Sequence, residues 1–233
     1  MKNKKTLIIS MLAIVVVGLA IGFAAFSSSL TISSSSTVTP SSSTFKVCLS
    51  ETGTACSVSK TITPTVVGNV DAPYGFIVLN QFWTAVDSGG TKKSIGFTEP
   101  GESVTYNMYI RNDGEYTAYL NSIEFADETS TDISGNTVTA FKICGSVGVS
   151  NPPTDSLLNA ACNFINATVT VNNGTKTETA TNATKSGIDG FSLAPGATAT
   201  VTIKFEYEAS GTRADGSFYV SFGDIKFNYS TVD

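Results

Sequence analysis

The stretch Gly96–Gly114, GFTEPGESVTYNMYIRNDG, decides the fold. Its Pro100-Gly101 dipeptide suits the two central positions of a type II turn. From Val104 to Arg111 apolar side chains then alternate with polar ones. This period of two is typical of a strand with one face on a core and the other in water.

The residues that follow predict how this strand continues. Asn112-Asp113-Gly114-Glu115 predicts a hairpin turn. The return strand begins at Tyr116, and its apolar phase shifts between Leu120 and Ile123, which predicts a β-bulge.

The unit recurs in outline about ninety residues later, as a distant internal similarity or as a generic turn before a strand. Gly190–Gly196 again places a Phe before a Pro-Gly dipeptide, and Ala199–Tyr207 alternates in the same way. Two further strands, Phe218–Phe222 and Ile225–Tyr229, close the chain on either side of a predicted Gly-Asp turn.

The remaining segments complete an all-β pattern. Thr61–Val67 contains Pro64 and predicts an edge strand or loop. Asp155–Asn163 predicts one short helix, with Thr154 as its cap. Short strands separated by turns favour a jelly-roll or immunoglobulin-like β-sandwich, formed as one domain by residues 44–233.

Ahead of this domain, residues 1–24 predict an export signal. Three lysines open the chain, and Thr6–Phe26 carries no charge. Gly22 and Ala24 supply small residues at the −3 and −1 positions, so cleavage is expected between Ala24 and Ala25. The apolar run is also long enough to cross a bilayer, for which about 20 residues suffice, so an uncleaved anchor helix is the alternative.

Residues 25–43 predict an N-terminal strand and a Ser/Thr-rich linker. Between Phe26 and Thr39 every odd position is Ser or Thr, and the apolar residues occupy even positions. One face would therefore enter a core. The strand is either an edge strand of its own domain or a donor strand that completes a neighbouring subunit. Its core-facing residues are Phe26, Leu30, Ile32 and Val38.

Four cysteines in an exported chain predict two disulfides. Three pairings are possible. Proximity in sequence favours Cys48–Cys56 and Cys144–Cys162, and four buried thiols are the alternative. The prediction places the protein outside the cytoplasm.

Composition excludes several functions. The chain has no histidine. This excludes Ser-His-Asp and Cys-His catalytic sites and zinc sites with histidine ligands. Chemistry based on carboxylates or lysine alone stays open, as in an extracellular hydrolase, but no nucleophile and base can be matched, so we expect no enzyme, no catalytic residue, no metal site and no cofactor. The formal net charge of −5 disfavours nucleic acid and anionic membrane surfaces as partners.

Three further patterns carry less information. Four sequons make glycosylation possible, at a number expected by chance: Asn166, Asn173, Asn182 and Asn228. Asp127, Glu128 and Asp132 fit no calcium-loop spacing and predict a solvated acidic loop. The apolar run Tyr74–Trp83 predicts core rather than a sugar-binding platform.

The leader ending Gly-Phe-Ala-Ala-Phe, the Ser/Thr-rich strand after it and the Pro-Gly strand ending Asn-Asp-Gly resemble the TasA/camelysin group. The closing Phe-Gly-Asp-Ile-Lys-Phe is similar to related surface proteins, and archaeal thread and bundling-pilus subunits are similar in plan. The resemblance implies an exported, jelly-roll biofilm-matrix fibre subunit. Its N-terminal strand would complete the sandwich of the next subunit. The protease role described for some members is not expected here, because histidine is absent.

The sequence thus predicts a secreted structural protein of the cell surface or extracellular space. We expect it to form a homopolymer, a filament or biofilm matrix, by donating the N-terminal strand. Other matrix or surface proteins are further partners. A membrane-anchored monomeric adhesin, held only by its leader, is the alternative.

Overall fold

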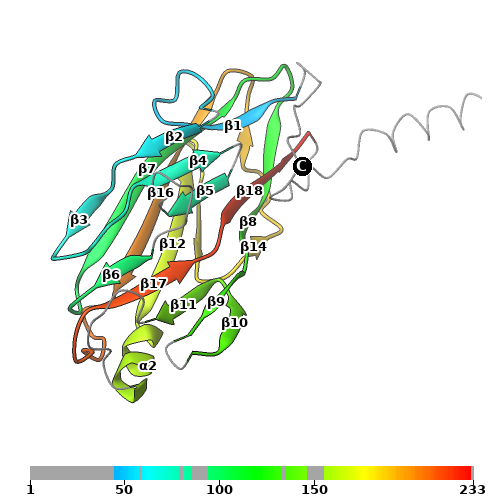
Figure 1. The fold of residues 1–233 in the computed structure, drawn as a ribbon. Helices are drawn as coiled ribbons and strands as arrows, with labels where there is room; N and C mark the ends of the chain where they lie inside the picture. The colour runs from blue at the N-terminus through cyan, green and yellow to red at the C-terminus, as the bar shows by residue number, and fades with distance from the viewer. Residues whose placement is uncertain are drawn as a thin grey trace, which may run out of the picture. The chain divides into compact units, whose positions relative to one another are not determined.

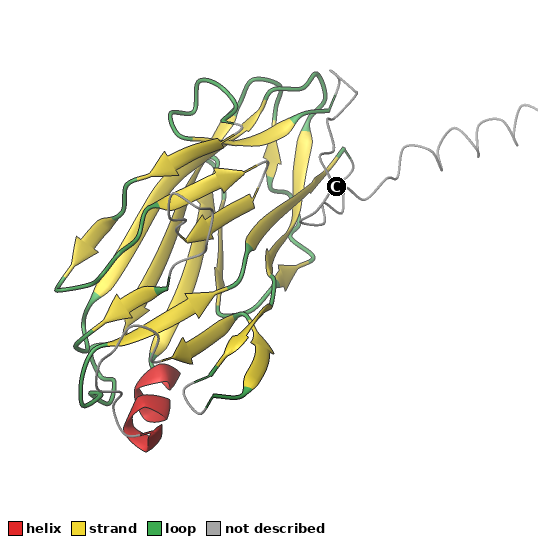
Figure 2. Cartoon of the chain, in the orientation of Figure 1, coloured by secondary structure: helices red, strands yellow, loops and turns green. Residues whose placement is uncertain are grey.

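A computed structural model describes residues 45–57, 59–78, 81–84, 94–132, 135–145 and 155–231. The predicted leader, the donor strand and Thr154 lie outside these residues. The described chain is a β-sandwich of antiparallel sheets with one helix, as predicted (Figures 1 and 2). Its elements are β1 Val47–Ser50, β2 Ser59–Ile62, β3 Thr65–Val67, β4 Gly75–Val78, β5 Gln81–Thr84, β6 Ile95–Phe97, β7 Ser103–Asn112, β8 Ala118–Phe125, β9 Glu128–Thr131, β10 Thr137–Ala140, β11 Lys142–Gly145, α2 Asp155–Asn163, β12 Ile165–Asn172, β13 Thr177–Thr181, β14 Lys185–Ser186, β15 Ser192–Leu193, β16 Thr198–Tyr207, β17 Phe218–Phe222 and β18 Ile225–Ser230.

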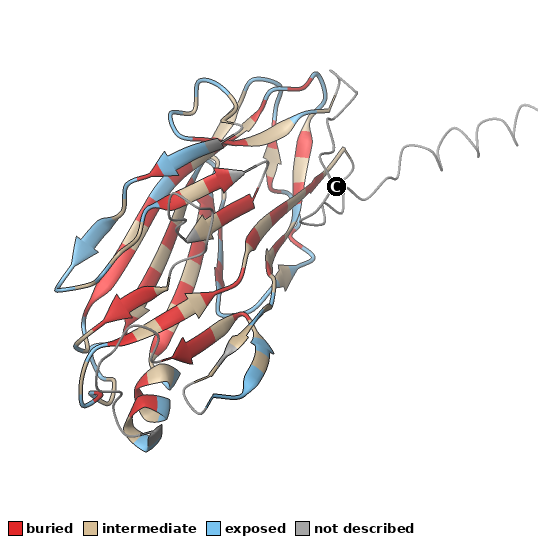
Figure 3. Cartoon of the chain, viewed as in Figure 1, coloured by how far each residue is buried: buried red, intermediate tan, exposed pale blue. Residues whose placement is uncertain are grey.

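The first layer is a six-stranded sheet built around the long strands β7 and β16. Its order is β1-β7-β16-β12-β13, and β3 also pairs with β7. Along β12 and β16 buried and half-exposed residues alternate, which Figure 3 shows as alternating colours. The periodicity of the sequence therefore predicts which face of this sheet enters the core.

The second layer contains a seven-stranded sheet, β14-β8-β18-β5-β4-β2 with β15 on β8, and a three-stranded sheet, β11-β17-β6. β17 leads into β18 through Gly223-Asp224. The backbone N–H of Gly223 donates to Phe141, and Ala126 donates to Asp224, so hydrogen bonds continue across the break. The predicted Gly-Asp turn is therefore wrong, because these residues form a kink between two nearly continuous strands.

Aromatic side chains join the two layers. Phe82 of β5 packs on Tyr106 of β7, with ring centroids 5.1 Å apart. Phe205 of β16 packs on Phe222 of β17 at 4.3 Å. Both contacts connect a strand of one layer to a strand of the other. Together with the aliphatic residues of both layers they form one continuous core.

The two Pro-Gly units recognised in the sequence lie together at the centre of the first layer. β7 and β16 pair from Ser103–Glu206 to Arg111–Thr198. The Gly101 N–H donates to the Tyr207 carbonyl, where β16 ends, and the Gly196 N–H donates to the Asn112 carbonyl, where β7 ends. Each turn thus closes the other unit's strand, and both glycines have the positive φ that a type II turn requires.

The predicted hairpin at Asn112–Glu115 is wrong. β7 and β8 lie in different sheets, so the segment crosses between layers. The Asn112 side chain is fully buried and donates to the carbonyls of Tyr116 and Leu193. Asn and Gly are favoured both in an arch that crosses between sheets and in a hairpin, because both connections need tight turns.

Two local predictions are confirmed, and one is only partly correct. The β18–β8 register skips Asn121, which gives the predicted bulge. α2 has the predicted bounds. In Tyr74–Trp83, Ile77 and Phe82 are buried, but Tyr74 is 58% exposed because it precedes β4 on the outer side.

Candidate assembly edges

The two predicted disulfides are present and stabilise opposite parts of the sandwich. Cys48–Cys56 links β1 to the loop after it, with Cα atoms 5.5 Å apart. Cys144–Cys162 links β11 to the C-terminal turn of α2, with Cα atoms 6.1 Å apart. Lys142 also donates to the Cys162 and Ile165 carbonyls at that end, and burial lowers the pKa of its ammonium group. Disulfides persist in oxidising compartments, so the fold belongs outside a reducing cytoplasm.

Two short strands, β1 and β3, pair with the outer side of β7 and leave a stretch of β7 between them. β1 pairs with Tyr109–Asn112 of β7, and β3 pairs with Ser103–Thr105. No described strand pairs with Tyr106–Met108 on this side. β3 is exposed along its length, and its Val67 side chain is 57% exposed.

The opposite edge of this layer, β13, carries a charge that points inward. Glu178 alternates with exposed threonines and is buried on the core side. Its carboxylate bonds to Lys185 and lies 3.1 Å from the Lys176 ammonium group. The hydrogen bond from Lys185, reinforced by Lys176, lowers the pKa of Glu178 against the opposing effect of burial. An inward-pointing charge protects an edge strand against pairing with another chain.

The third edge lies inside the second layer, along β18. On one side β18 pairs with β8 over its whole length. On the other side β5 pairs only with Ile225 and Lys226, and Lys226 lies opposite Gln81, the first residue of β5. Among the described residues, no strand pairs with Phe227–Tyr229 on this side.

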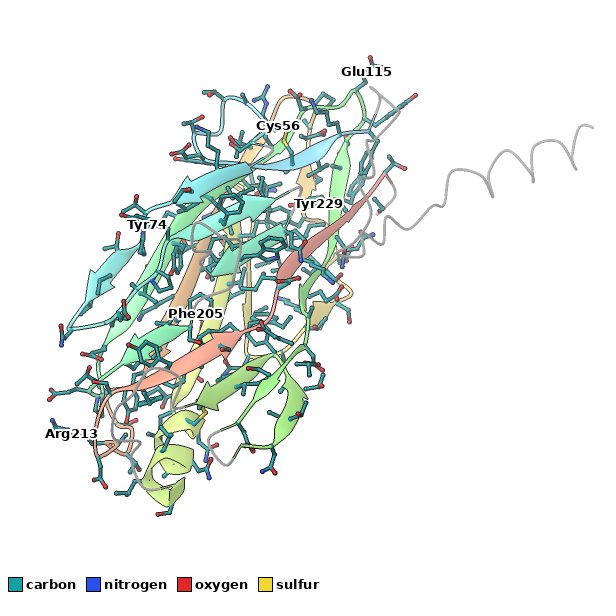
Figure 4. All side chains as sticks on the ribbon, in the orientation of Figure 1. Cys56, Tyr74, Glu115, Phe205, Arg213 and Tyr229 are labelled. Atoms are coloured by element: carbon teal, nitrogen blue, oxygen red, sulfur yellow. A yellow bond between two sulfur atoms is a disulfide. The ribbon has the colours of Figure 1, made fainter. Side chains whose placement is uncertain are left out.

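The inward side chains of this stretch are apolar except for one hydroxyl. Phe227 and Tyr229 are 6% and 8% exposed. Figure 4 labels Tyr229 near the C-terminal end of β18. Its hydroxyl is buried and has no hydrogen-bond partner, and burial raises its pKa. Buried polar groups are nearly always paired, so an orphan hydroxyl beside an incomplete ladder needs an explanation.

The four sequon asparagines have structural hydrogen bonds. The Asn166 amide donates to Glu208, and Asn182 donates to Asn166 at 2.5 Å. Asn173 donates to the Ser192 carbonyl, and Asn228 to Ser122. Glycosylation remains a sequence prediction that the structure does not test.

A pocket and an acidic segment are further polar features of the described residues. A shallow pocket of about 210 Å³ is lined by Asn69, Val70, Asp71, Gly96, Thr98, Ser217 and Tyr219. Ligand pockets usually start near 300 Å³. In the described part of the chain no three acidic or cysteine side chains group as metal ligands. Glu128 lies in β9, so the predicted acidic loop is wrong at that residue, and the Asp132 side chain accepts the Asn136 N–H after β9.

No helix within the described ranges is long and apolar enough to cross a membrane. The predicted cleavage residues Ala24 and Ala25 lie outside the described residues. So do the donor residues Phe26, Leu30, Ile32 and Val38.

Comparison of the chain with protein-family models, curated proteins and solved structures finds no match. The resemblance to the TasA/camelysin group therefore stays a prediction from sequence motifs.

Sequence reasoning missed the two features that distinguish these edges. Glu178 had a readable signal, since it occupies the core-facing phase between Thr177 and Thr179. The incomplete ladder of β18 had no signal, because it depends on where the β4–β5 hairpin ends in space.

Proposed function

We propose that this chain is a secreted structural protein, the subunit of an extracellular filament or biofilm matrix. Neighbouring subunits join when the strand Phe26–Val38 of one completes the sandwich of the next. The stretch Phe227–Tyr229 of β18, beside which no described strand pairs on one side, carries this proposal, because open ladder positions bind an added strand through main-chain hydrogen bonds. The disulfides support a location outside the cytoplasm.

The chemistry of the donor strand matches such a role. Burying its four apolar side chains would contribute about 1.5–3 kcal/mol each as an upper range. A strand that leaves one subunit and enters another makes a head-to-tail contact, and such contacts form open filaments when the rotation does not close a ring. One repeated contact is therefore enough to build a fibre.

Removal of the donor strand tests the proposal directly. Deletion of Phe26–Val38 is expected to abolish filaments of the purified mature protein in electron micrographs and leave a folded monomer. A double substitution, Leu30→Ser with Ile32→Ser, should do the same, because it removes only the central apolar residues.

The matched control changes the other face of the same strand. Ser29→Ala with Ser33→Ala keeps the apolar stripe and should leave filaments intact. Filaments of normal appearance from the deletion would refute donation. A monomeric wild-type chain that retains Met1 would favour the membrane-anchored adhesin.

A further inference from the structure

We infer that the donated strand binds beside Phe227–Tyr229 of β18, with Leu30 opposite Tyr229 and Ile32 opposite Phe227. This inference rests on the proposed function, and it assigns the acceptor and the register of the contact. The occupant is a second copy of this chain.

The acceptor has two inward positions, and they select one part of the donor. Phe227 and Tyr229 are consecutive core-facing residues of β18. In the donor, the core-facing phase reads Phe26, Ser28, Leu30, Ile32, Ser34, Ser36, Val38. Leu30 and Ile32 are its only consecutive apolar pair, and cross-strand pairs of aromatic and aliphatic side chains stabilise a sheet.

The position of β5 fixes where the added strand must end. β5 already occupies the ladder opposite Lys226. With Ile32 opposite Phe227 in antiparallel orientation, Ser33 lies opposite Lys226, where the ladder is already filled, so the pairing with β18 uses the first half of the donor strand. Every strand pair between described strands is antiparallel, so the added strand follows the same rule.

The same register supplies a partner for the orphan hydroxyl. Ser28 then lies diagonally across from Tyr229 on the inward face. Diagonal neighbours in antiparallel pairs are about 7–8 Å apart, within reach of a long aromatic side chain. A hydrogen bond between the two hydroxyls would satisfy the buried Tyr229 group in the assembled filament.

The interval at Tyr106–Met108 of β7 is the competing acceptor. There the inward side chains of Tyr106 and Met108 are fully buried by the subunit's own core, and the Tyr106 hydroxyl already donates to the Pro73 carbonyl at 2.6 Å. The interval is also enclosed by β1 and β3 at its two ends. Both intervals are three residues long, but the one on β7 has no unsatisfied side-chain group, so β18 is the better acceptor.

Cross-linking between subunits tests the register. Full-length chains carrying Thr31→Cys are mixed with chains carrying Asn228→Cys, assembled and oxidised, because these outward positions lie opposite each other in the assigned register. The expected result is a disulfide between subunits, identified by mass spectrometry. Ser29→Cys and Ser33→Cys lie two residues from Thr31 on the same face, so each is diagonal to Asn228→Cys. Both should cross-link to it several-fold less, since a disulfide requires Cα atoms within about 7 Å.

The outcomes separate this inference from the proposed function. Filaments whose Thr31→Cys chains cross-link instead to Asn107→Cys on β7 would overturn the β18 assignment and leave strand donation standing. A link formed only within one chain, when both substitutions are present, would show that the strand serves its own subunit. Absence of wild-type filaments would refute the proposed function itself.

The hydroxyl contact has its own measurement, which also covers a failure of Asn228→Cys to fold. Tyr229→Phe and Ser28→Ala should each lower the urea concentration that dissociates filaments, and the double variant should be no weaker than either one. Additive losses, or none from Tyr229→Phe, would overturn the contact, because only directly interacting residues show non-additive effects.

Discussion

The β13 edge and the open side of β18 are both places where a strand could be added, but they are built differently. β13 turns Glu178 toward the core and pairs it with two lysines. β18 turns Phe227 and Tyr229 toward the core and has no charge among its inward residues. The first edge resists an incoming strand, because a charge would have to be buried against it.

The difference indicates that edge protection in this sandwich is selective. Charges protect the β13 edge of the first layer, whereas in the second layer no described strand pairs with the apolar stretch Phe227–Tyr229 on one side. A protein that needed only to stay monomeric would be expected to protect both. The contrast is therefore what strand donation requires: one available acceptor and few competing ones. The following predictions test it, from the largest expected effect to the smallest.

Gly223→Ala should displace the Phe227–Tyr229 stretch of β18, because it disrupts the kink at Gly223-Asp224 that positions this strand. A Cβ atom at this residue would lie 1.8 Å from the Ala126 carbonyl oxygen, so the backbone of the second layer must move. We expect a loss of about 3 kcal/mol or complete failure to fold, measured by urea unfolding. Gly216→Ala is the matched control, because nothing lies within 4 Å of the added atom. Equal stability of the two variants would contradict the role of the kink.

Glu178→Gln removes the inward charge of β13. It should lower the free energy of unfolding and make that free energy less dependent on pH. The folded pKa of Glu178 lies below its ordinary value of 4.5, so its contribution is present above pH 4.5 and is lost as pH falls through the folded pKa. We expect a loss of about 1.5 kcal/mol at pH 7, typical of hydrogen bonds to a charged group. The loss should shrink toward pH 3, as followed by urea midpoints.

Glu206→Gln provides the comparison for that experiment. Glu206 pairs with Lys204 at 2.7 Å, and its side chain is 40% exposed. Exposed ion pairs contribute little, so this variant should stay near wild type in stability at pH 7. An equal loss in both variants would mean that burial on β13 gives Glu178 no special role.

Val67→Lys should have the smallest effect and tests whether β3 is a second contact edge. Val67 is exposed, so stability should change by no more than about 0.5 kcal/mol. If β18 is the acceptor, filament length in electron micrographs should not change. Tyr116→Lys, at 56% exposure and away from β3, controls for an added charge. Shorter filaments from Val67→Lys alone would transfer the acceptor role to β3.

Much of the fold was readable from local patterns. Alternation predicted the buried faces of β7 and β16, and Pro-Gly predicted both turns that close them. Proximity predicted both disulfides. These features depend on residues close in the chain, where turn chemistry and periodicity act directly.

The errors concern which strands become neighbours. Asn112–Gly114 fits a hairpin and an arch equally well, and only the pairing of β8 with β18 decides between them. The kink at Gly223 depends on the approach of Ala126, about a hundred residues earlier. The candidate acceptor on β18 had no local sequence signal for the same reason, since it depends on which residues of β18 pair with β5, far away in the chain.

Each Pro-Gly turn donates a hydrogen bond to the end of the other unit's strand, and this arrangement has a consequence for the folding rate. Ser103 must find Glu206, about one hundred residues away, before either central strand has its main neighbour. Sandwiches dominated by such distant pairings fold in milliseconds to seconds, far more slowly than helical bundles. Until β16 arrives, β7 exposes an unpaired edge of ten residues, and chains at high concentration can associate through it. Slow folding is thus a consequence of the same β7–β16 pairing that stabilises the finished sandwich.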